Sequence, residues 1–163
     1  MAKYLRAVVD DGTREVPILN KFGKEICKIY FRPADYSILD RLEKVGERLK
    51  AKLTALSDLE LTNTGEAVHE KDTAALKEAE KIVYDEFNYL FDMEEANLIF
   101  AKRSAFSSIG GHFFCLVVLD ALGDVITDAV KEEAALAQKR MAKYMDDVPD
   151  EVIADAGTTP EST

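Results

Sequence analysis

The sequence predicts an α+β fold, in which a short N-terminal β-meander of three strands packs on a helical bundle with a central buried helix. Alternating apolar and polar residues, typical of half-buried strands, occur only before Arg32. After Arg32 the apolar residues recur at spacings of three and four, as in amphipathic helices. Strands followed by helices favour α+β over alternating α/β. With 163 residues, 47% of them hydrophobic, we expect one domain over residues 1–145 and an acidic, disordered tail over 146–163.

The first two predicted strands are Lys3–Val9 and Arg14–Leu19, on either side of the turn sequence Asp10-Asp11-Gly12-Thr13. Pro17 has no N–H to donate, so a two-residue turn at Asp11-Gly12 would leave Arg6 without its bond from residue 17. A four-residue turn avoids this requirement. We therefore expect the longer turn, with Pro17 on a sheet edge.

The third predicted strand is Ile26–Phe31, after a turn at Phe22-Gly23. Its alternation points Cys27, Ile29 and Phe31 inward and Lys28 outward. Pro33 ends this strand, because proline suits the opening of a helix.

Two amphipathic helices and a short one are expected next. Asp35 is the predicted N-cap of the first, and its Gly46 is expected to let a neighbour approach closely. Leu59–Asp72 is a polar loop, the second helix covers Asp72–Phe91, and a short helix lies around Glu94–Phe100. The apolar stripes of the two long helices are Leu39, Leu42, Val45, Leu49, Leu53 and Leu56 on the first, and Leu76, Ala79, Ile82, Val83, Phe87, Leu90 and Phe91 on the second.

The last helix is the predicted centre of the fold. Phe113–Leu119 contains no polar residue in seven positions, which predicts burial on every side. A serine just before Ile109 is the expected N-cap, and the helix is expected to end near Tyr144-Met145. Asp120 and Asp124 interrupt the run well short of the ~20 apolar residues of a membrane span.

The net charge of −10 is concentrated at the C-terminus. Residues 146–163 contain six acidic and no basic residues, which leaves 21 basic and 25 acidic residues elsewhere. We expect neither nucleic-acid binding, which needs a basic surface, nor membrane association. Without an export signal at the N-terminus, and with Cys27 and Cys115 in apolar patterns, we expect reduced thiols and a cytoplasmic location.

The sequence offers no convincing catalytic, cofactor or metal site, and we expect no enzymatic activity. His112 and Cys115 share a helix face, but a structural zinc needs four ligands and the remaining candidates, His69 and Cys27, lie far away in the sequence. Adjacent acids point about 100° apart on a helix and do not converge on a substrate. Gly110-Gly111 lacks the context of a phosphate-binding loop, and Ser104, Ser107 and Ser108 lack that of a nucleophile.

Aromatic residues are dense between positions 87 and 114. Core packing explains most of them, and the remainder could form an apolar groove for a partner helix. The candidate partner-binding residues are Phe87, Phe91, Phe100, Phe106 and Phe113.

Several segments together resemble tail assembly chaperones of long-tailed (siphovirus-type) phages and prophages of Gram-positive bacteria. The likeness spans roughly Val16 to Tyr144 and depends on the order and spacing of its segments. They are Val16-Pro17-Ile18, Phe22-Gly23, Ile29-Tyr30-Phe31-Arg32-Pro33-Ala34-Asp35-Tyr36, Tyr89-Leu90-Phe91 and Phe106-Ser107-Ser108-Ile109-Gly110-Gly111-His112-Phe113-Phe114.

This resemblance implies a non-enzymatic chaperone that binds and solubilises the tape measure protein in the host cytoplasm and is absent from the mature virion. Many copies would be needed along so long a client, so self-association or multivalent coating is expected. A longer frameshifted form would contact the major tail tube protein. The alternatives are a structural head–tail connector or tail completion protein, and an acidic inhibitor that mimics DNA.

Overall fold

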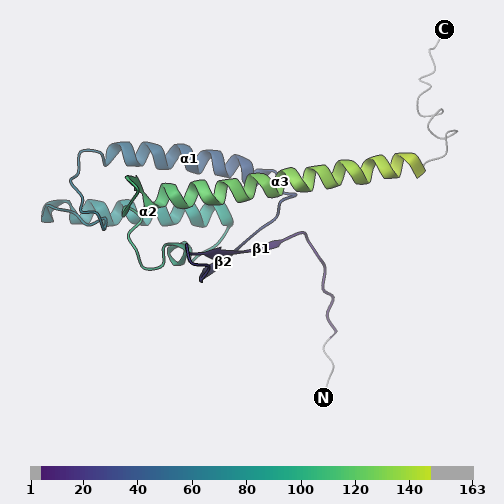
Figure 1. Ribbon diagram of the computed structural model, residues 1–163, viewed down its shortest axis with the longest axis horizontal. Helices are drawn as coiled ribbons and strands as arrows, with labels where there is room; N and C mark the ends of the chain where they lie inside the picture. The colour runs from purple at the N-terminus through teal and green to yellow at the C-terminus, as the bar shows by residue number, and fades with distance from the viewer. Residues whose placement is uncertain (1–4, 148–163) are drawn as a thin grey trace, which may run out of the picture.

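The computed structural model describes residues 5–147 and confirms a fold of mixed helices and strands (Figure 1). Three long helices lie together, and a small β-hairpin lies against them. The elements in chain order are β1 (Arg14–Leu19), β2 (Glu25–Phe31), α1 (Ser37–Ala55), the 3-10 helix η1 (Glu70–Asp72), α2 (Thr73–Phe91), the 3-10 helix η2 (Ala96–Phe100), β3 (Ser108–Ile109), β4 (His112–Phe113) and α3 (Phe114–Asp147).

The β1–β2 hairpin matches the second predicted turn. Val16 pairs with Ile29 and Arg14 pairs with Phe31 in antiparallel register. Asn20 shapes the turn, because its Oδ1 accepts hydrogen bonds from the amides of Phe22 and Lys24. As predicted from the alternation, Ile29 and Phe31 are buried in the core.

The predicted strand Lys3–Val9 is wrong, so the three-stranded meander is a two-stranded hairpin. Residues 5–13 contain no strand, and Leu5, Val8 and Val9 are exposed. Asp10 and Asp11 instead accept hydrogen bonds from the amides two residues further on. Such local bonds compete with a ladder, and alternation alone provides no surface on which to bury the strand. Pro17 does lie in an edge strand, since among residues 5–147 β1 pairs only with β2.

Helices α1 and α2 pack against each other through the predicted stripes. Tyr36 rather than Asp35 is the N-cap of α1, although the Asp35 carboxylate accepts a hydrogen bond from the Ser37 amide. Gly46 does not admit a close neighbour, because a Cβ there would meet no atom within 4 Å. The glycine that faces another helix is Gly123 of α3, where an added Cβ would lie 3.8 Å from the Leu42 methyl groups.

A short hairpin, β3–β4, replaces the predicted serine cap before α3. Gly110 and Gly111 form its two-residue turn with φ of 57° and 84°, values that suit a primed turn and that glycine adopts without strain. The first amides of α3 donate to backbone carbonyls, Phe114 to Ser107 and Cys115 to Ala105, each at 2.8 Å. Backbone carbonyls of the incoming chain thus cap the helix in place of a side chain.

Helix α3 is not buried on every side. One stripe faces the core, formed by Cys115, Leu119, Leu122, Ile126 and Val130. Val117 and Val118, within the all-apolar run, are only partly buried. Beyond Ala134 the helix projects from the body, and residues 135–146 are exposed (Figure 1). It ends at Asp147, two residues past the expected domain boundary, and the rest of the predicted tail lies outside the described residues.

None of the helices within residues 5–147 combines the length and the apolar character that crossing a membrane requires.

Candidate apolar binding groove

Four of the five phenylalanines predicted to bind a partner lie in the hydrophobic core. Phe87, Phe91, Phe100 and Phe106 are at most 6% exposed. The Phe100 ring contacts Phe87 edge-on, with ring centroids 5.5 Å apart, and meets Phe114 in the same way at 5.6 Å. In this fold the four side chains stabilise the core and present no docking surface.

Phe113 is the exception among the predicted residues, since it is only partly buried. Its ring lies edge-on to Phe106, with centroids 5.8 Å apart. Because β4 places it at the start of α3, it anchors the β3–β4 hairpin on the core.

An apolar groove lies instead between the β1–β2 hairpin and the outer face of α3. Its volume is about 510 Å³, within the range of pockets that hold apolar side chains or small ligands. Ile18 and Ile26 of the hairpin form one wall, and Ile99 of η2 and Ile109 of β3 contribute to the lining. The groove thus joins segments from four separate parts of the chain.

The α3 wall of the groove is an apolar stripe of its own. Phe114, Val117, Val118 and Ala121 follow one another at spacings of three, one and three, which places them on one side of the helix. This side lies away from Cys115 and Leu119, which face the core. The all-apolar run therefore combines two faces, one for the core and one for the groove.

The rim of the groove is polar and carries positive charge. Asn20, Lys21 and Arg103 line it next to the apolar walls. Such a groove can hold the apolar side of a helix while its cations meet acidic residues that flank that side. The sequence signal for it is the continuous run at Phe113–Leu119, which by itself indicates only burial.

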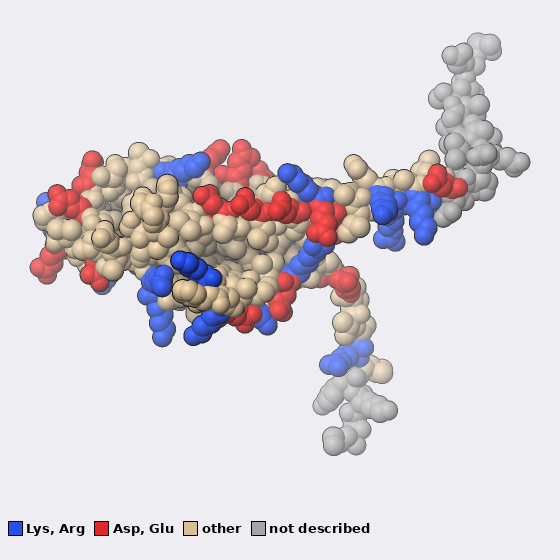
Figure 2. Space-filling view, in the orientation of Figure 1, with Lys and Arg blue, Asp and Glu red and all other residues tan. Residues whose placement is uncertain are grey.

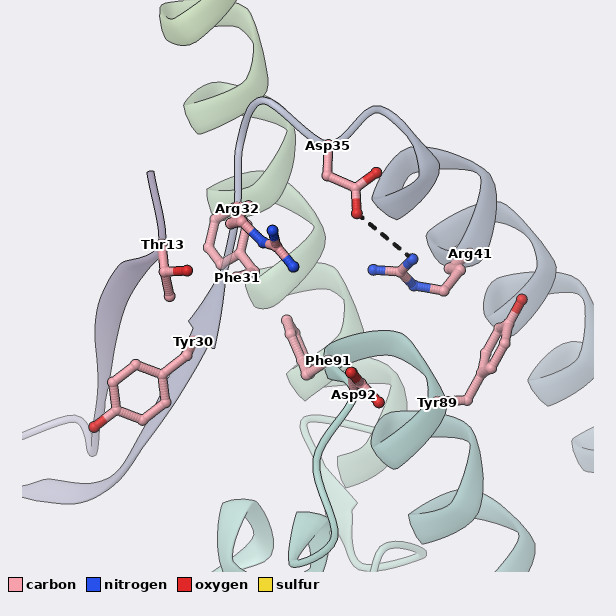
Figure 3. A pocket seen from close by; sticks show the side chains of 9 residues that line it. All are labelled: Thr13, Tyr30, Phe31, Arg32, Asp35, Arg41, Tyr89, Phe91 and Asp92. Carbon is pink, nitrogen blue, oxygen red and sulfur yellow. Dashed lines mark ion pairs between the residues drawn. The ribbon is translucent and has the colours of Figure 1, made fainter. Parts of the chain in front are cut away.

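A second hollow, more polar, lies at the corner between β2 and α1 (Figure 3). Its volume is about 370 Å³, and Tyr30, Arg32 and Asp35 line it from the segment that carries the family resemblance. The Asp35 carboxylate lies 4.0 Å from Arg41, and hydrogen bonds from Ser37 hold the pKa of Asp35 below its usual range.

The side chain of Arg41 has a structural role at this hollow. Its Nε donates to the Leu90 carbonyl of α2 at 3.3 Å and its Nη1 to the Ser37 hydroxyl at 2.8 Å. The first bond ties α1 to the end of α2, whereas the second lies within α1 and holds the Arg41 side chain in place.

The candidate metal and catalytic groups do not come together. His112 is exposed on β4, whereas Cys115 is buried, and burial raises the pKa of its thiol to about 12. Of the adjacent acids, Glu132 and Glu133 both pair with Arg14, at 3.6 and 3.4 Å. Across residues 5–147, no three His, Cys, Asp or Glu side chains gather into a possible metal site.

Glu86 of α2 is an acid with a largely buried side chain. Its side chain is 15% exposed, and its Oε2 lies 3.1 Å from Arg48 Nε, an ion pair without hydrogen-bond geometry. Burial raises the pKa of Glu86 more than Arg48 lowers it. The folded state therefore holds the Glu86 proton more tightly than the unfolded chain, and this term lowers stability as the pH rises past the ordinary glutamate range.

Replacing Glu86 with glutamine is expected to raise the free energy of unfolding at pH 7 by about 1 kcal/mol or less. Arg48 keeps its stacking on Tyr89, 4.8 Å from the ring centroid. Urea unfolding at pH 7 and near pH 4 checks this, because the gain must shrink at the lower pH. Asp85→Asn, at the neighbouring position, is the matched control, and a loss of stability in Glu86→Gln at pH 7 would contradict the assignment.

Compared with known proteins, the chain matches no family model, no curated protein and no solved structure.

Proposed function

We propose that this protein is a phage tail assembly chaperone that holds apolar helical segments of a tape measure protein in the groove between the β1–β2 hairpin and α3. The observation that carries the proposal is the groove itself, an apolar hollow of about 510 Å³ with a cationic rim. The resemblance of the segments between Val16 and Tyr144 to this family supports the choice of client.

The chemistry of the groove suits an amphipathic helix. Apolar side chains at helical spacing on the client would enter between Ile26 and Val117, and acidic residues beside them would meet Lys21 and Arg103. Apolar burial supplies the affinity and is little affected by salt, whereas the rim charges are screened. A long client would need many copies, each bound through a short segment.

The proposal places the protein in the cytoplasm of the bacterial host and outside the finished virion. A longer frameshifted form that contacts the tail tube protein belongs to the same proposal.

Co-expression with the tape measure protein of the same genome tests the function. The tape measure protein alone is expected to be insoluble, and the chaperone is expected to carry it into the soluble fraction and to co-purify with it in about 1 M salt. Val117→Asp should abolish this effect, because an aspartate in the groove wall would lose its hydration when the client binds.

Val117→Asp should still fold, because Val117 lies on the side of α3 away from the core and near the helix N-terminus, where an acid is favourable. Val68→Asp, at an exposed valine outside the groove, is the matched control and should act like the wild type. If the client stays insoluble with the wild type, or the complex dissociates at modest salt, the proposal fails. Recovery of the protein in purified particles would then favour the connector alternative.

A further inference from the structure

The rim of the apolar groove belongs to a larger cluster of positive charge. Lys21 and Arg103 line the groove, and Lys24, Lys102 and Arg103 line an adjoining hollow of about 810 Å³. Within residues 5–147 none of these four side chains forms an ion pair. Figure 2 shows basic side chains gathered on the lower side of the body, where the β1–β2 hairpin and η2 lie in Figure 1.

The acidic side chains beside this cluster do not neutralise it. Glu25 and Glu80 line the adjoining hollow, and neither is ion-paired among the described residues. Glu80 is engaged elsewhere, because its Oε1 accepts hydrogen bonds from the Tyr84 hydroxyl at 3.0 Å and the Ala105 amide at 3.1 Å. The groove and its surroundings thus keep a net positive charge, although the whole chain has a net charge of −10.

The C-terminal part of the sequence carries a complementary pattern. Val152 and Ile153 are adjacent apolar residues, with Asp150 and Glu151 directly before them and Asp155 two positions after them. Residues 144–163 contain no lysine or arginine. Residues 150–155 lie outside the described part of the chain. Their sequence, an apolar pair flanked by acids, matches an apolar groove with a cationic rim.

The length of α3 prevents this segment from reaching the groove of its own copy. Within α3, Leu122 is the groove residue closest to the C-terminus, and α3 continues from there as one straight helix to Asp147 (Figure 1). About 25 residues of helix separate the two positions, a distance of about 38 Å along the axis. The residues from Asp147 to Val152, even fully extended, span about 18 Å at most. Residues 150–155 can therefore meet only the groove of another copy.

We infer that residues 150–155 of one copy bind the apolar groove of a second copy. Val152 and Ile153 enter between the apolar walls, and the acids beside them lie next to Lys21 and Arg103. Each copy offers one tail segment and one groove. The contact is therefore heterologous, and it joins further copies head to tail instead of closing a symmetric pair.

This inference depends on the groove and does not depend on the proposed client. Both halves of the contact belong to one chain, so every copy meets its partner at the concentration of the protein itself. Head-to-tail contacts also join as many copies as a long client would need. If the proposed function holds as well, the client and the tail segment compete for the same groove, and the segment covers the apolar walls until a client displaces it.

Sedimentation of the full-length protein over a range of concentrations tests the inference. The wild type is expected to form oligomers whose size grows with concentration. Ile153→Asp should weaken this association at least tenfold, because a carboxylate would have to enter the apolar groove. Val148→Asp is the matched control, since it makes the same kind of change outside residues 150–155, and it should assemble like the wild type.

Mixing two variants tests the head-to-tail arrangement. Val117→Asp has a damaged groove and an intact tail segment, whereas Ile153→Asp has an intact groove and a damaged segment. Each variant alone should stay monomeric. An equimolar mixture should form dimers and nothing larger, because only one working contact remains for each pair. Val68→Asp, at an exposed valine outside the groove, should assemble like the wild type.

Charge reversal at the rim is a second way to damage the groove, and it leaves the apolar walls intact. Lys21→Glu combined with Arg103→Glu should weaken the association at least tenfold, because the acids of the tail segment would then meet like charges. Circular dichroism should be unchanged, since neither side chain belongs to the core.

A wild type that stays monomeric at several hundred micromolar would overturn the inference, and so would an equimolar mixture that forms no dimer. Oligomers that survive both Ile153→Asp and Val117→Asp would show that another surface joins the copies. Co-expression with the tape measure protein separates this inference from the proposed function, because Ile153→Asp should still carry the client into the soluble fraction. Failure of the wild type to do so, with self-assembly intact, would overturn the proposed function alone.

Discussion

Phe100→Ala is expected to remove a large part of the stability of the fold. The side chain is fully buried, and its ring touches three other rings, those of Tyr84, Phe87 and Phe114. Truncating a buried phenylalanine costs about 3–5 kcal/mol, the lost transfer energy plus the energy of the cavity left behind. Because domains of this size are stable by ~5–15 kcal/mol, the variant should unfold at a much lower urea concentration or fail to accumulate.

Leu98→Ala is the control, since Leu98 belongs to the same 3-10 helix but is 49% exposed. It should lower the free energy of unfolding by a fraction of that amount. Comparing the two variants also tests the role of Phe100, which the sequence analysis predicts to contact a partner. A Phe100→Ala protein with wild-type stability and lost client binding would show that the aromatic residue lies at an interface after all.

The long helices could be predicted because their signal is local and repeated. Leu49 on α1 and Val83 on α2 belong to stripes with polar residues between the apolar ones, so the periodicity itself reveals the buried side. The same reasoning predicted the inward face of β2, where Ile29 and Phe31 alternate with exposed neighbours. In these elements the local pattern and the tertiary packing agree.

The groove could not be predicted, because a run in which every residue is apolar has no periodicity to show which side of the helix faces the core. Leu119 and Val117 are two positions apart in one run, yet Leu119 faces the core and Val117 faces the groove. Only the position of the β1–β2 hairpin separates the two faces. The hairpin lies far earlier in the sequence, so the local pattern around α3 does not show that it packs there.

The misplaced N-terminal strand has a related cause. Leu5, Ala7 and Val9 would share one face of a strand, but strand formation depends on a neighbouring strand and a surface to cover. For the β3–β4 hairpin the turn signal Gly110-Gly111 is present in the sequence, but its two-residue strands are too short to show an alternation of their own.

Gly65→Ala is expected to be the most damaging change outside the core. Gly65 has φ of +83°, and a Cβ there would lie 2.5 Å from Ser104 Oγ and 2.8 Å from the Ser107 amide nitrogen. The polar loop is tied to the segment before α3 at this point, because the Ser108 amide donates to the Asn63 carbonyl and the Ser107 hydroxyl to the Thr64 carbonyl. The added methyl group would force these two segments apart. We expect the free energy of unfolding to fall by about 3 kcal/mol or more, because the backbone strain and the broken contacts both contribute.

Gly23→Ala is the matched control for Gly65→Ala, because it separates the cost of the backbone strain from the cost of the steric clash. Gly23 has φ of +84°, but a Cβ there would meet no atom within 4 Å, so this variant bears only the conformational cost of about 1–2 kcal/mol. In thermal unfolding, the melting temperature of Gly65→Ala should therefore be well below that of Gly23→Ala. Adding Ser104→Gly should recover part of the loss, because it removes the hydroxyl and Cβ that the new methyl group strikes. Equal melting temperatures for the two alanine variants would mean that the loop does not approach Ser104 as closely as the structure has it.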